Sequence, residues 1–248
     1  MEKLSIKSYG LELALTPFTN IIGMPASGKT TLLRILINQI PNFEVELDGK
    51  NVESLSLLFK RRNIAVCVGD LKFSSLTVKE ELLFYQNKCE FTPQTSVDNL
   101  DEISIYFGLE DSLNKPINEL SIYEQALIKI LSLLIIKPQI LGIDNFLSYL
   151  SPALKQKVIT YAKNNNVSIL NITANKEELL LGTTLVILEK HQVKAIGPTK
   201  EILENEALLA TAGFELPTVA SISSGLNYYE LLNKKYYSAK TLVGALWK

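Results

Sequence analysis

The sequence predicts an α/β fold in which a mostly parallel β-sheet forms the core. Short β-prone runs alternate with longer helical patterns along most of the chain, and this alternation is typical of parallel sheets with right-handed helical crossovers. A glycine-rich motif at residues 23–30 joins a β-prone run directly to a helical one. A block of helical pattern from about residue 77 to 132 interrupts the alternation, which indicates an inserted helical region.

The expected strands lie on both sides of this helical block. Residues 11–15 and 43–47 alternate apolar and polar side chains, as half-buried strands do, and the second run ends at the turn Asp48-Gly49. The other expected strands are mainly apolar runs at residues 20–22, 64–68, 140–143 and 168–173, followed by a hairpin over residues 185–196.

The expected helices carry apolar residues at helical spacing. They cover residues 31–37, 78–85, 97–107, 122–134 and 152–163. Pro41 ends the first helix, and Thr77 is placed to cap the second, with Glu80 in the reciprocal capping-box position. After about residue 209 the pattern indicates a small appended helical piece.

Residues 23–30, Gly-Met-Pro-Ala-Ser-Gly-Lys-Thr, complete the pattern G-x-x-x-x-G-K-[ST] of a phosphate-binding loop. Such a loop presents backbone N–H groups and the positive end of the following helix to the phosphates of a nucleotide. Lys29 is expected to reach the β- and γ-phosphates, and the Thr30 hydroxyl is expected to hold Mg²⁺. The expected nucleotide-binding residues are Gly23, Met24, Pro25, Ala26, Ser27, Gly28, Lys29, Thr30 and Thr31.

Composition indicates a soluble, somewhat apolar globular protein, with 47% hydrophobic and 21% charged residues in a chain of 248. The net charge of −1 provides no basic face, so no nucleic-acid partner is expected. Cys67 and Cys89 lack metal-ligand spacing, and Cys67 lies in an apolar run where a buried thiol is expected. The N-terminus is unlike a signal peptide and residues 130–136, the most apolar stretch, are too few to cross a bilayer, so a cytoplasmic location is expected.

Further motifs make the chain similar to an ATP-binding cassette (ABC) ATPase over essentially its whole length. They lie at residues 48–52 (the turn after the third strand), 120–125 (the L-S-G-G-Q signature), 140–144 (Walker B), 147–152 (the D-loop) and 197–202 (the end of the core domain). The interval from Ser121 to Asp144 has the length usual in that family. The resemblance implies the P-loop NTPase fold of an ABC ATPase, with an antiparallel β region beside the parallel sheet. It also implies ATP and Mg²⁺ as cofactors, with Thr30 and Asp144 at the metal.

The tail narrows the resemblance further. Residues 213–219, Gly-Phe-Glu-Leu-Pro-Thr-Val, followed by a helix, resemble the C-terminal extension of energy-coupling-factor (ECF) ATPases, which drive bacterial uptake of vitamins and metal ions. We therefore expect an ABC ATPase domain at residues 1–208, with a helical subdomain at about 70–133, and an ECF-like extension at 209–248. The resemblance implies two partners, a second ABC ATPase subunit in a homo- or heterodimer and a membrane coupling protein. It therefore places the chain peripherally on the cytoplasmic face of the cell membrane.

Five positions depart from the family pattern where an active member carries catalytic or nucleotide-contacting groups. They are Gly69 at the Q-loop glutamine, Tyr123 in the signature, Asn145 at the catalytic glutamate, Ser151 at the D-loop aspartate and Ala174 at the switch histidine. An asparagine amide cannot accept a proton at physiological pH, and a positioned base contributes roughly 10²–10⁴-fold to a rate. Hydrolysis on this chain's own loop is therefore expected to be impaired, and no catalytic residue is assigned.

The residue that would stack on adenine is left open. Tyr9 is the only tyrosine upstream of the loop, but the segment is short for the family, and Tyr9 or Phe18 could equally be a core aromatic. His191, the only histidine of the chain, lies beside Lys190 in the expected hairpin. It is expected to be a solvent-exposed turn residue rather than a ligand.

Three functions remain in competition. The first is an ATP-binding subunit of an ABC/ECF-type membrane transporter that binds MgATP, is impaired in hydrolysis and pairs with a competent ATPase. The second is a fully active transport ATPase in which Glu124, Asp70 or Asn145 supplies the missing groups. The third is a soluble P-loop kinase or nucleotide sensor, against which the lack of an arginine cluster in the helical region argues.

Overall fold

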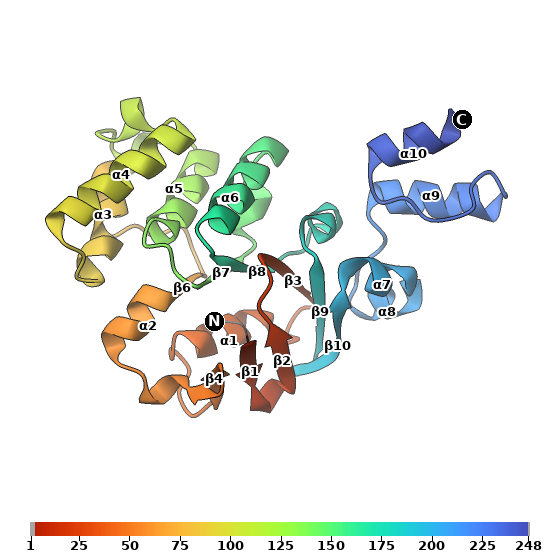
Figure 1. Ribbon diagram of the computed structural model, residues 1–248, viewed down its shortest axis with the longest axis horizontal. Helices are drawn as coiled ribbons and strands as arrows, with labels where there is room; N and C mark the ends of the chain where they lie inside the picture. Colours follow the sequence, from red (N-terminus) through yellow and green to blue (C-terminus); the bar gives the residue numbers. More distant parts are fainter. Residues whose placement is uncertain (1–2, 248) are drawn as a thin grey trace.

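The computed structural model describes residues 3–247, which form two β-sheets with helices packed around them (Figure 1). The larger sheet has the strand order β10–β9–β3–β8–β7–β6. Its strands are β3 (Phe18–Ile22), β6 (Ile64–Cys67), β7 (Ile140–Asp144), β8 (Ser168–Ile172), β9 (Thr184–Glu189) and β10 (Gln192–Pro198). Neighbouring strands are parallel except β9 and β10, which form the C-terminal hairpin. This confirms the predicted α/β fold with a mostly parallel sheet.

The smaller sheet is antiparallel and has the strand order β2–β1–β4–β5. Its strands are β1 (Lys3–Ile6), β2 (Leu11–Ala14), β4 (Val45–Leu47) and β5 (Lys50–Asn51). Along β2 buried and exposed residues alternate, as the sequence pattern predicted. The buried face shares one core cluster with Leu32 and Leu33 of the first helix, so this sheet and that helix pack together.

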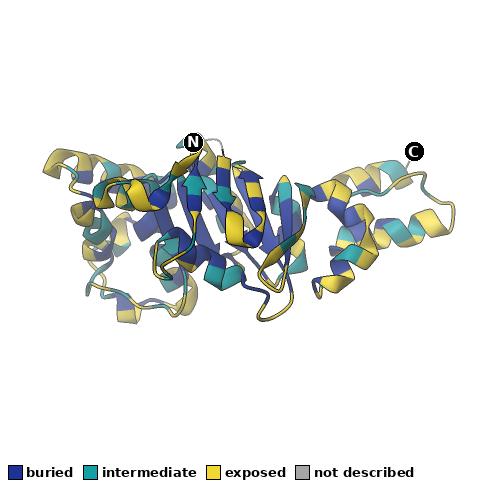
Figure 2. Ribbon diagram, turned by 90° about the horizontal axis from the view of Figure 1, so that it is seen from below, coloured by how far each residue is buried: buried dark blue, intermediate teal, exposed yellow. Residues whose placement is uncertain are grey.

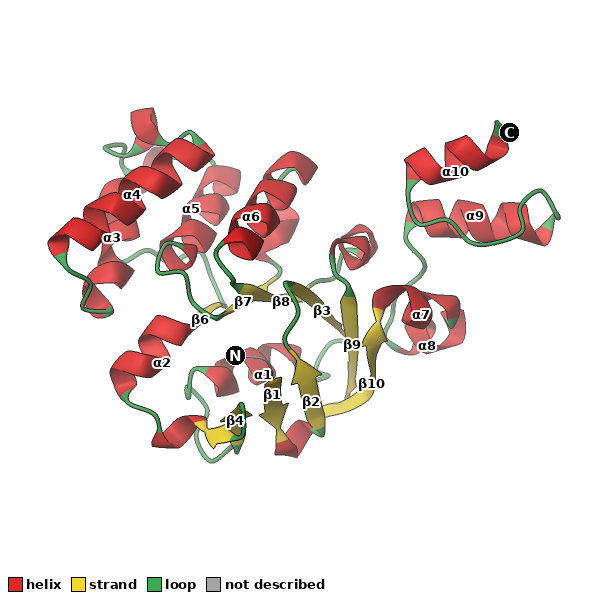
Figure 3. Cartoon of the chain, in the orientation of Figure 1, coloured by secondary structure: helices red, strands yellow, loops and turns green. Residues whose placement is uncertain are grey.

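Helices cover the sheets and make up the rest of the ordered elements (Figure 3). The α-helices are α1 (Lys29–Leu36), α2 (Leu57–Asn63), α3 (Val78–Lys88), α4 (Pro93–Phe107), α5 (Ile122–Leu134), α6 (Pro152–Asn164), α7 (Thr199–Glu204), α8 (Glu206–Thr211), α9 (Thr218–Tyr228) and α10 (Ala239–Leu246). Short 3₁₀ segments are η1 (Lys7–Tyr9), η2 (Val52–Ser54), η3 (Glu110–Ser112), η4 (Ile117–Glu119), η5 (Phe146–Tyr149) and η6 (Lys176–Leu181). Over residues 3–247, none of the helices combines the length and apolar character needed to span a membrane.

The helix ends explain where several of these elements begin. The predicted capping box is present on α3, because the N–H of Glu80 donates to Thr77 Oγ1 at 3.3 Å and the N–H of Thr77 donates to Glu80 Oε2 at 3.1 Å. Helix α2 was not predicted. It begins at a cap in which Ser56 Oγ accepts the N–H of Phe59 at 3.1 Å, and it buries no residue, so it lacks the apolar stripe that reveals most helices.

The helical block of α3, α4 and α5 lies beside β6 at one end of the larger sheet (Figure 1). Leu82 and Ile103 of this block belong to the same core cluster as Cys67 and Leu141 of the sheet. Figure 2 shows the buried positions gathered in the strands and on the inward faces of the helices. Cys67 is 1% exposed, as predicted, and its burial raises the pKa of the thiol to about 12.

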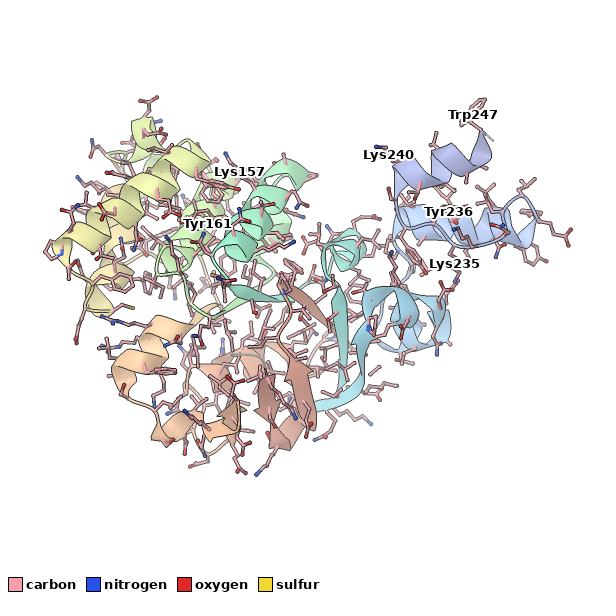
Figure 4. The ribbon with its side chains drawn as sticks, in the orientation of Figure 1. Lys157, Tyr161, Lys235, Tyr236, Lys240 and Trp247 are labelled. Atoms are coloured by element: carbon pink, nitrogen blue, oxygen red, sulfur yellow. The ribbon has the colours of Figure 1, made fainter. Side chains whose placement is uncertain are left out.

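Helix α6 contacts α4 of this block and so links the block to the rest of the molecule. The Tyr161 hydroxyl donates to Glu102 Oε1 of α4 at 2.9 Å. Lys157 Nζ lies 5.5 Å from the centroid of the Tyr106 ring and 5.6 Å from that of Phe107, within the range of a cation–π contact. Figure 4 shows Lys157 and Tyr161 on the side of α6 that faces α4.

The C-terminal helices α9 and α10 extend beyond α7 and α8, away from the sheets (Figure 1). The turn before α9 is tied to η6, because Glu177 Oε1 accepts the N–H of Thr218 at 2.9 Å and its hydroxyl at 2.6 Å. The same turn reaches the glycine-rich loop, since a Cβ added at Gly213 would lie 2.6 Å from Met24 Sδ. The expected boundary at residue 209 falls inside α8, and the division of the chain into two domains stays a prediction.

Candidate functional site

The glycine-rich loop leaves the carboxyl end of β3, which is buried along its whole length between β8 and β9. A Cβ at Gly23 would lie 2.3 Å from the Leu188 carbonyl oxygen, and Gly28 has a φ of +97°, so both positions require glycine. The loop therefore leads into α1, and its backbone N–H groups lie beside the N-terminus of that helix. There the helix dipole and the free N–H groups favour an anion.

The Lys29 ammonium lies across the loop that precedes it. Its Nζ donates to the carbonyl oxygens of Gly23 at 2.6 Å and Met24 at 2.9 Å, and to Ser27 Oγ at 3.2 Å. Burial lowers the pKa of Lys29, and the negative charge of Asp144 offsets part of that change. The ammonium is thus held over the loop by three hydrogen bonds to loop atoms.

The two predicted metal-binding residues lie side by side. Thr30 Oγ1 donates to Asp144 Oδ2 at 2.5 Å. They meet because β7 ends at Asp144, and β3, β8 and β7 are neighbouring parallel strands whose carboxyl ends share one edge of the sheet. Hydroxyl and carboxylate oxygens are ligands that Mg²⁺ prefers. Within residues 3–247, no group of three or more His, Cys, Asp or Glu side chains that could hold a metal ion is found.

Asn145 links the ends of β7 and β8. Its Nδ2 donates to Asp144 Oδ1 at 3.1 Å, while its Oδ1 accepts the N–H of Ala174 at 3.1 Å. The backbone N–H of Asn145 also donates to the Ile172 carbonyl at 2.9 Å, and its φ of +62° is a left-handed conformation that asparagine tolerates. A carboxylate has no N–H and could not make the contact with Asp144. The expected catalytic-glutamate and switch-histidine positions are therefore joined by a structural hydrogen bond.

A cleft of about 520 Å³ opens beside Asp144 and Asn145. It is lined by Thr30, Arg34, Gly69, Asp70, Leu71, Ile122, Asp144, Asn145, Phe146 and Tyr149. The cleft brings together residues of the phosphate-binding loop, the expected Q-loop and Walker B positions and the first residue of α5. At the Q-loop position Gly69 has no side chain to contribute, whereas the exposed Asp70 carboxylate lies 3.3 Å from Lys72 Nζ.

Ser121 and Glu124 together cap the N-terminus of α5. Glu124 Oε2 accepts the N–H of Ser121 at 2.8 Å and its hydroxyl at 2.7 Å, and Ser121 Oγ accepts the N–H of Glu124 at 3.3 Å. These hydrogen bonds, the one from the Ser121 hydroxyl above all, lower the pKa of the Glu124 carboxyl. Ile122 and Tyr123, at the two signature-glycine positions, are 50% and 63% exposed. The pattern S-x-x-E could have predicted this cap from the sequence.

The structure shows whether the aromatic residues upstream of the loop are core residues or available to stack on adenine. Tyr9 is 1% exposed and donates its hydroxyl to the Gly28 carbonyl at 3.0 Å, and Phe18 is 2% exposed. Both are therefore core aromatics, and neither offers a ring face to a ligand. His191 is an exposed turn residue, as predicted, but its N–H donates to the Ser27 carbonyl at 2.9 Å. No sequence pattern indicated this contact with the loop.

A buried polar network beneath the site was also not predicted. Lys155 Nζ and Glu178 Oε1 are 2.6 Å apart, with only 11% and 1% of their side chains exposed. Asn171 Nδ2 donates to Glu178 Oε2 at 3.1 Å and to Asn20 Oδ1 at 3.0 Å. The network connects β3, which leads into the loop, with β8, which leads to Ala174. Asn20 and Asn171 are 151 residues apart, so no local pattern could reveal that they meet.

The chain matches known proteins along most of its length. Residues 6–148 match the family described as ABC transporter. A putative ABC transporter ATP-binding protein of Archaeoglobus fulgidus is 30% identical over 220 residues, which cover 84% of this chain and 90% of that protein. The energy-coupling factor transporter ATP-binding protein EcfA1 of Mesomycoplasma hyopneumoniae is 25% identical over 256 residues, covering 100% of this chain and 93% of that protein.

Solved structures have the same fold. The structure of cbiO1 from Clostridium perfringens, described as part of the ABC transporter complex cbiONQ, gives a TM-score of 0.69 at 18% identity and covers 87% of this chain and 91% of that chain. A bacterial Atm1-family ABC exporter with ATP bound gives 0.71 at 15% identity, covering 86% of this chain and 42% of that one. These likenesses confirm the expected ABC ATPase fold. Because the family match spans residues 6–148, the chain belongs to the ABC transporter family, and its expected resemblance to ECF-type ABC ATPases is confirmed.

Proposed function

We propose that this chain is the ATP-binding subunit of an ECF-type membrane transporter, that it binds MgATP with little hydrolysis, and that it pairs with a competent ATPase subunit. Relatives named as energy-coupling factor transporter ATP-binding proteins support a role in transport. They favour this role over a kinase or a soluble nucleotide sensor.

The arrangement around Lys29 supports the binding of MgATP. Its ammonium lies over the loop, hydrogen-bonded to the Gly23 and Met24 carbonyls, and the motif assigns this side chain to the β- and γ-phosphates. The adjacent oxygens of Thr30 and Asp144 suit a hard cation, and the residues present therefore fit MgATP. When bound, this group supplies the phosphates that Lys29 neutralises. The proposed nucleotide-binding residues are Gly23, Met24, Pro25, Ala26, Ser27, Gly28, Lys29, Thr30 and Thr31, with Asp144 sharing the metal.

The amide of Asn145 is the single observation that carries the proposal of impaired hydrolysis. It stands where a general base is expected, it has no basic lone pair for a proton, and both of its ends are already hydrogen-bonded. Ala174, at the switch position, contributes only its backbone N–H to that same bond. A water attacking the terminal phosphate would therefore meet no proton acceptor on either residue.

The residues at the signature position also support slow hydrolysis of the nucleotide bound by the partner subunit. In the head-to-tail dimers of this family, each nucleotide lies between one phosphate-binding loop and the opposite signature. A nucleotide on the partner would face the exposed side chains of Ile122 and Tyr123 instead of glycine backbone. It would also face the Glu124 carboxylate, which repels phosphate. We therefore expect slow turnover even from the assembled pair.

The C-terminal extension offers a surface for the partner ATPase. Its exposed apolar side chains include Tyr228, Tyr229, Leu231 and Trp247, which are 83%, 73%, 64% and 86% exposed. Figure 4 shows Trp247 at the far end of α10. We propose that these side chains contact the partner ATPase, because apolar side chains left exposed to water are often buried in protein–protein contacts. The membrane coupling protein is the second proposed partner, and it would place the chain peripherally on the cytoplasmic face of the cell membrane.

An active transport ATPase is the second candidate, and Asp70 is the observation that favours it. Its exposed carboxylate lines the same cleft as Thr30 and Asp144 and could accept a proton from water. Glu124 cannot take that role without giving up the cap of α5. An Asp70→Asn variant distinguishes the candidates, because it abolishes turnover only if Asp70 is the base.

The test is to measure ATP affinity by calorimetry and phosphate release for the purified chain, alone and with a candidate partner ATPase. Micromolar binding with negligible turnover of the chain alone is expected. Turnover comparable to that of active ABC ATPases, abolished by Lys29→Ala, would contradict the proposal of impaired hydrolysis. Co-purification of a polytopic membrane protein with the tagged chain tests the transport role separately.

A further inference from the structure

The turn between β9 and β10 is held against the phosphate-binding loop at two points. The N–H of His191 donates to the Ser27 carbonyl at 2.9 Å. Next to it, Gln192 Nε2 donates to the Ser8 carbonyl of η1 at 2.7 Å. The turn is therefore fixed between the loop and η1, and the direction in which the His191 ring projects is set by backbone contacts.

The His191 ring lies on the loop itself. A Cβ added at Gly28 would be 2.2 Å from His191 Cδ2, so the ring packs directly over the glycine that begins α1. Its centroid is 5.9 Å from that of Tyr9, which is buried beneath the loop. His191 is nonetheless an exposed residue. It thus combines contact with the loop and a ring that solvent or a ligand can reach.

The position of the phosphates indicates where the rest of a nucleotide must go. The terminal phosphates and the metal belong with Lys29, Thr30 and Asp144, on the side of the cleft. His191 is not part of the lining of that cleft. We expect the nucleoside to extend from the loop away from the metal. The His191 ring lies against Gly28 of the loop and outside the metal-side cleft, so it is placed to meet a base on that side.

Other aromatic rings near the loop are unsuitable as a surface for the base. Tyr9 and Phe18 are 1% and 2% exposed, and Phe146 is 4% exposed. Tyr149 is partly exposed, but it lines the metal-side cleft. Of the five rings Tyr9, Phe18, Phe146, Tyr149 and His191, the ring of His191 combines exposure, contact with Gly28 and a place outside the metal-side cleft.

We propose that the base of the bound nucleoside triphosphate stacks on the imidazole ring of His191, in the role that the upstream Tyr9 cannot fill. This inference rests on the proposed binding of nucleotide at the loop. Stacking on a ring face is tolerant of base identity, so it provides affinity with little base selectivity. The pre-set turn means that little side-chain freedom is lost when the base arrives.

The test compares ATP with inorganic triphosphate, each with Mg²⁺, by calorimetry on the full chain. The variant is His191→Asn, because asparagine accepts the left-handed backbone of this position, φ +63°, and keeps the N–H bond to Ser27 while removing the ring. Lys190→Asn is the matched control, since it lies in the same turn, also at positive φ, and has no ring. The expected result is a loss of ATP affinity of roughly tenfold in His191→Asn, with triphosphate affinity unchanged and the affinity ratio of the two ligands unchanged in Lys190→Asn.

Several outcomes contradict the proposal. Equal losses for both ligands in His191→Asn would show that the ring only supports the loop, and unchanged ATP affinity would show that the base lies elsewhere. Either result leaves the proposed nucleotide function standing. Wild-type protein that binds neither ATP nor triphosphate would contradict the nucleotide function and this inference with it.

Nuclear magnetic resonance provides a direct second readout, because His191 is the only histidine of the chain. In protein without a histidine tag, its imidazole C–H signals are the only ones of their kind. Adenine stacked on the ring shifts them by its ring current, so ATP is expected to move these signals much more than triphosphate does. Equal shifts with the two ligands would overturn the proposal.

Discussion

The phosphate-binding loop and the segments that carry Tyr123, Asn145 and Ala174 differ in how far they keep the family pattern. The loop keeps every residue of its motif, and its two glycines are required by the backbone, since Gly23 has no room for a Cβ and Gly28 has a φ of +97°. At Asn145, Tyr123 and Ala174 the chain departs from the catalytic or nucleotide-contacting groups that the resemblance leads us to expect, and of these three only Asn145 lines the cleft. The contrast supports the proposal that this chain binds a nucleotide without hydrolysing it.

The altered positions are not idle in the fold. Asn145 ties Asp144 to the backbone of Ala174, and Ser151 caps α6 by accepting the N–H of Leu154 at 3.3 Å. Ser121, which the family pattern retains, is engaged in a capping box. Side chains that would turn toward a nucleotide in an active enzyme are hydrogen-bonded to this chain's own backbone and neighbours. The altered segments are therefore expected to support structure, whereas the loop is expected to support binding.

The largest effect is expected from breaking the network that supports both regions. Lys155→Met leaves the buried Glu178 carboxylate without its counter-charge, which typically costs about 3–5 kcal/mol of unfolding free energy. Lys194→Met, which removes the partner of Glu189 in a partly exposed pair, is the control and is expected to cost about 0–1 kcal/mol. Urea unfolding of the two variants measures both values. Similar costs for the two would show that the network does not hold the site together.

The loop alone is tested by Lys29→Ala. Removing this ammonium should weaken ATP binding by roughly 100-fold, because a charge-assisted contact with the phosphates is lost. Stability should change little, since Lys29 hydrogen-bonds only to loop atoms in the absence of a phosphate. Lys79→Ala, on the exposed surface of α3, serves as the charge-matched control. If both variants bound ATP equally well, the loop would not be the binding site.

The opposite experiment restores the carboxylate and the imidazole that the family pattern leads us to expect at residues 145 and 174. Asn145→Glu combined with Ala174→His should raise turnover in the presence of the partner by roughly tenfold, below the usual contribution of a positioned base because the signature stays altered. Asn145→Gln with the same Ala174→His change is the control, since it lengthens the side chain without adding a base. An equal rise in both variants would mean that the lost base is not what limits hydrolysis.

The smallest effect is expected from Ser121→Ala. Loss of the α5 cap should lower the unfolding free energy by about 1 kcal/mol and leave ATP affinity unchanged. Ser151→Ala removes the comparable cap of α6 and should cost a similar amount. Thermal unfolding and calorimetry together check this prediction. If Ser121→Ala changed the turnover of the assembled pair more than Ser151→Ala does, Ser121 would contact nucleotide and the prediction would be wrong.

Sequence patterns predicted those parts of the fold that depend on neighbouring residues. The alternation in residues 11–15, the loop motif and the Thr77 capping box are of this kind, and each is present in the structure. Helix α2 escaped prediction because it buries no residue and so has no apolar stripe. The bridge from Asn145 to Ala174 spans 29 residues and exists only because β7 and β8 are parallel neighbours. Contacts of this kind arise from packing, and a single sequence carries no signal for them.

The most direct test of ATP binding without hydrolysis is a single-turnover experiment. Purified chain in excess over labelled MgATP is filtered at intervals, and the bound nucleotide is identified as ATP or ADP. Bound label that remains ATP over many minutes is predicted for the wild-type chain, with no label retained by Lys29→Ala. Bound label that converts to ADP within seconds would contradict the separation of binding from catalysis.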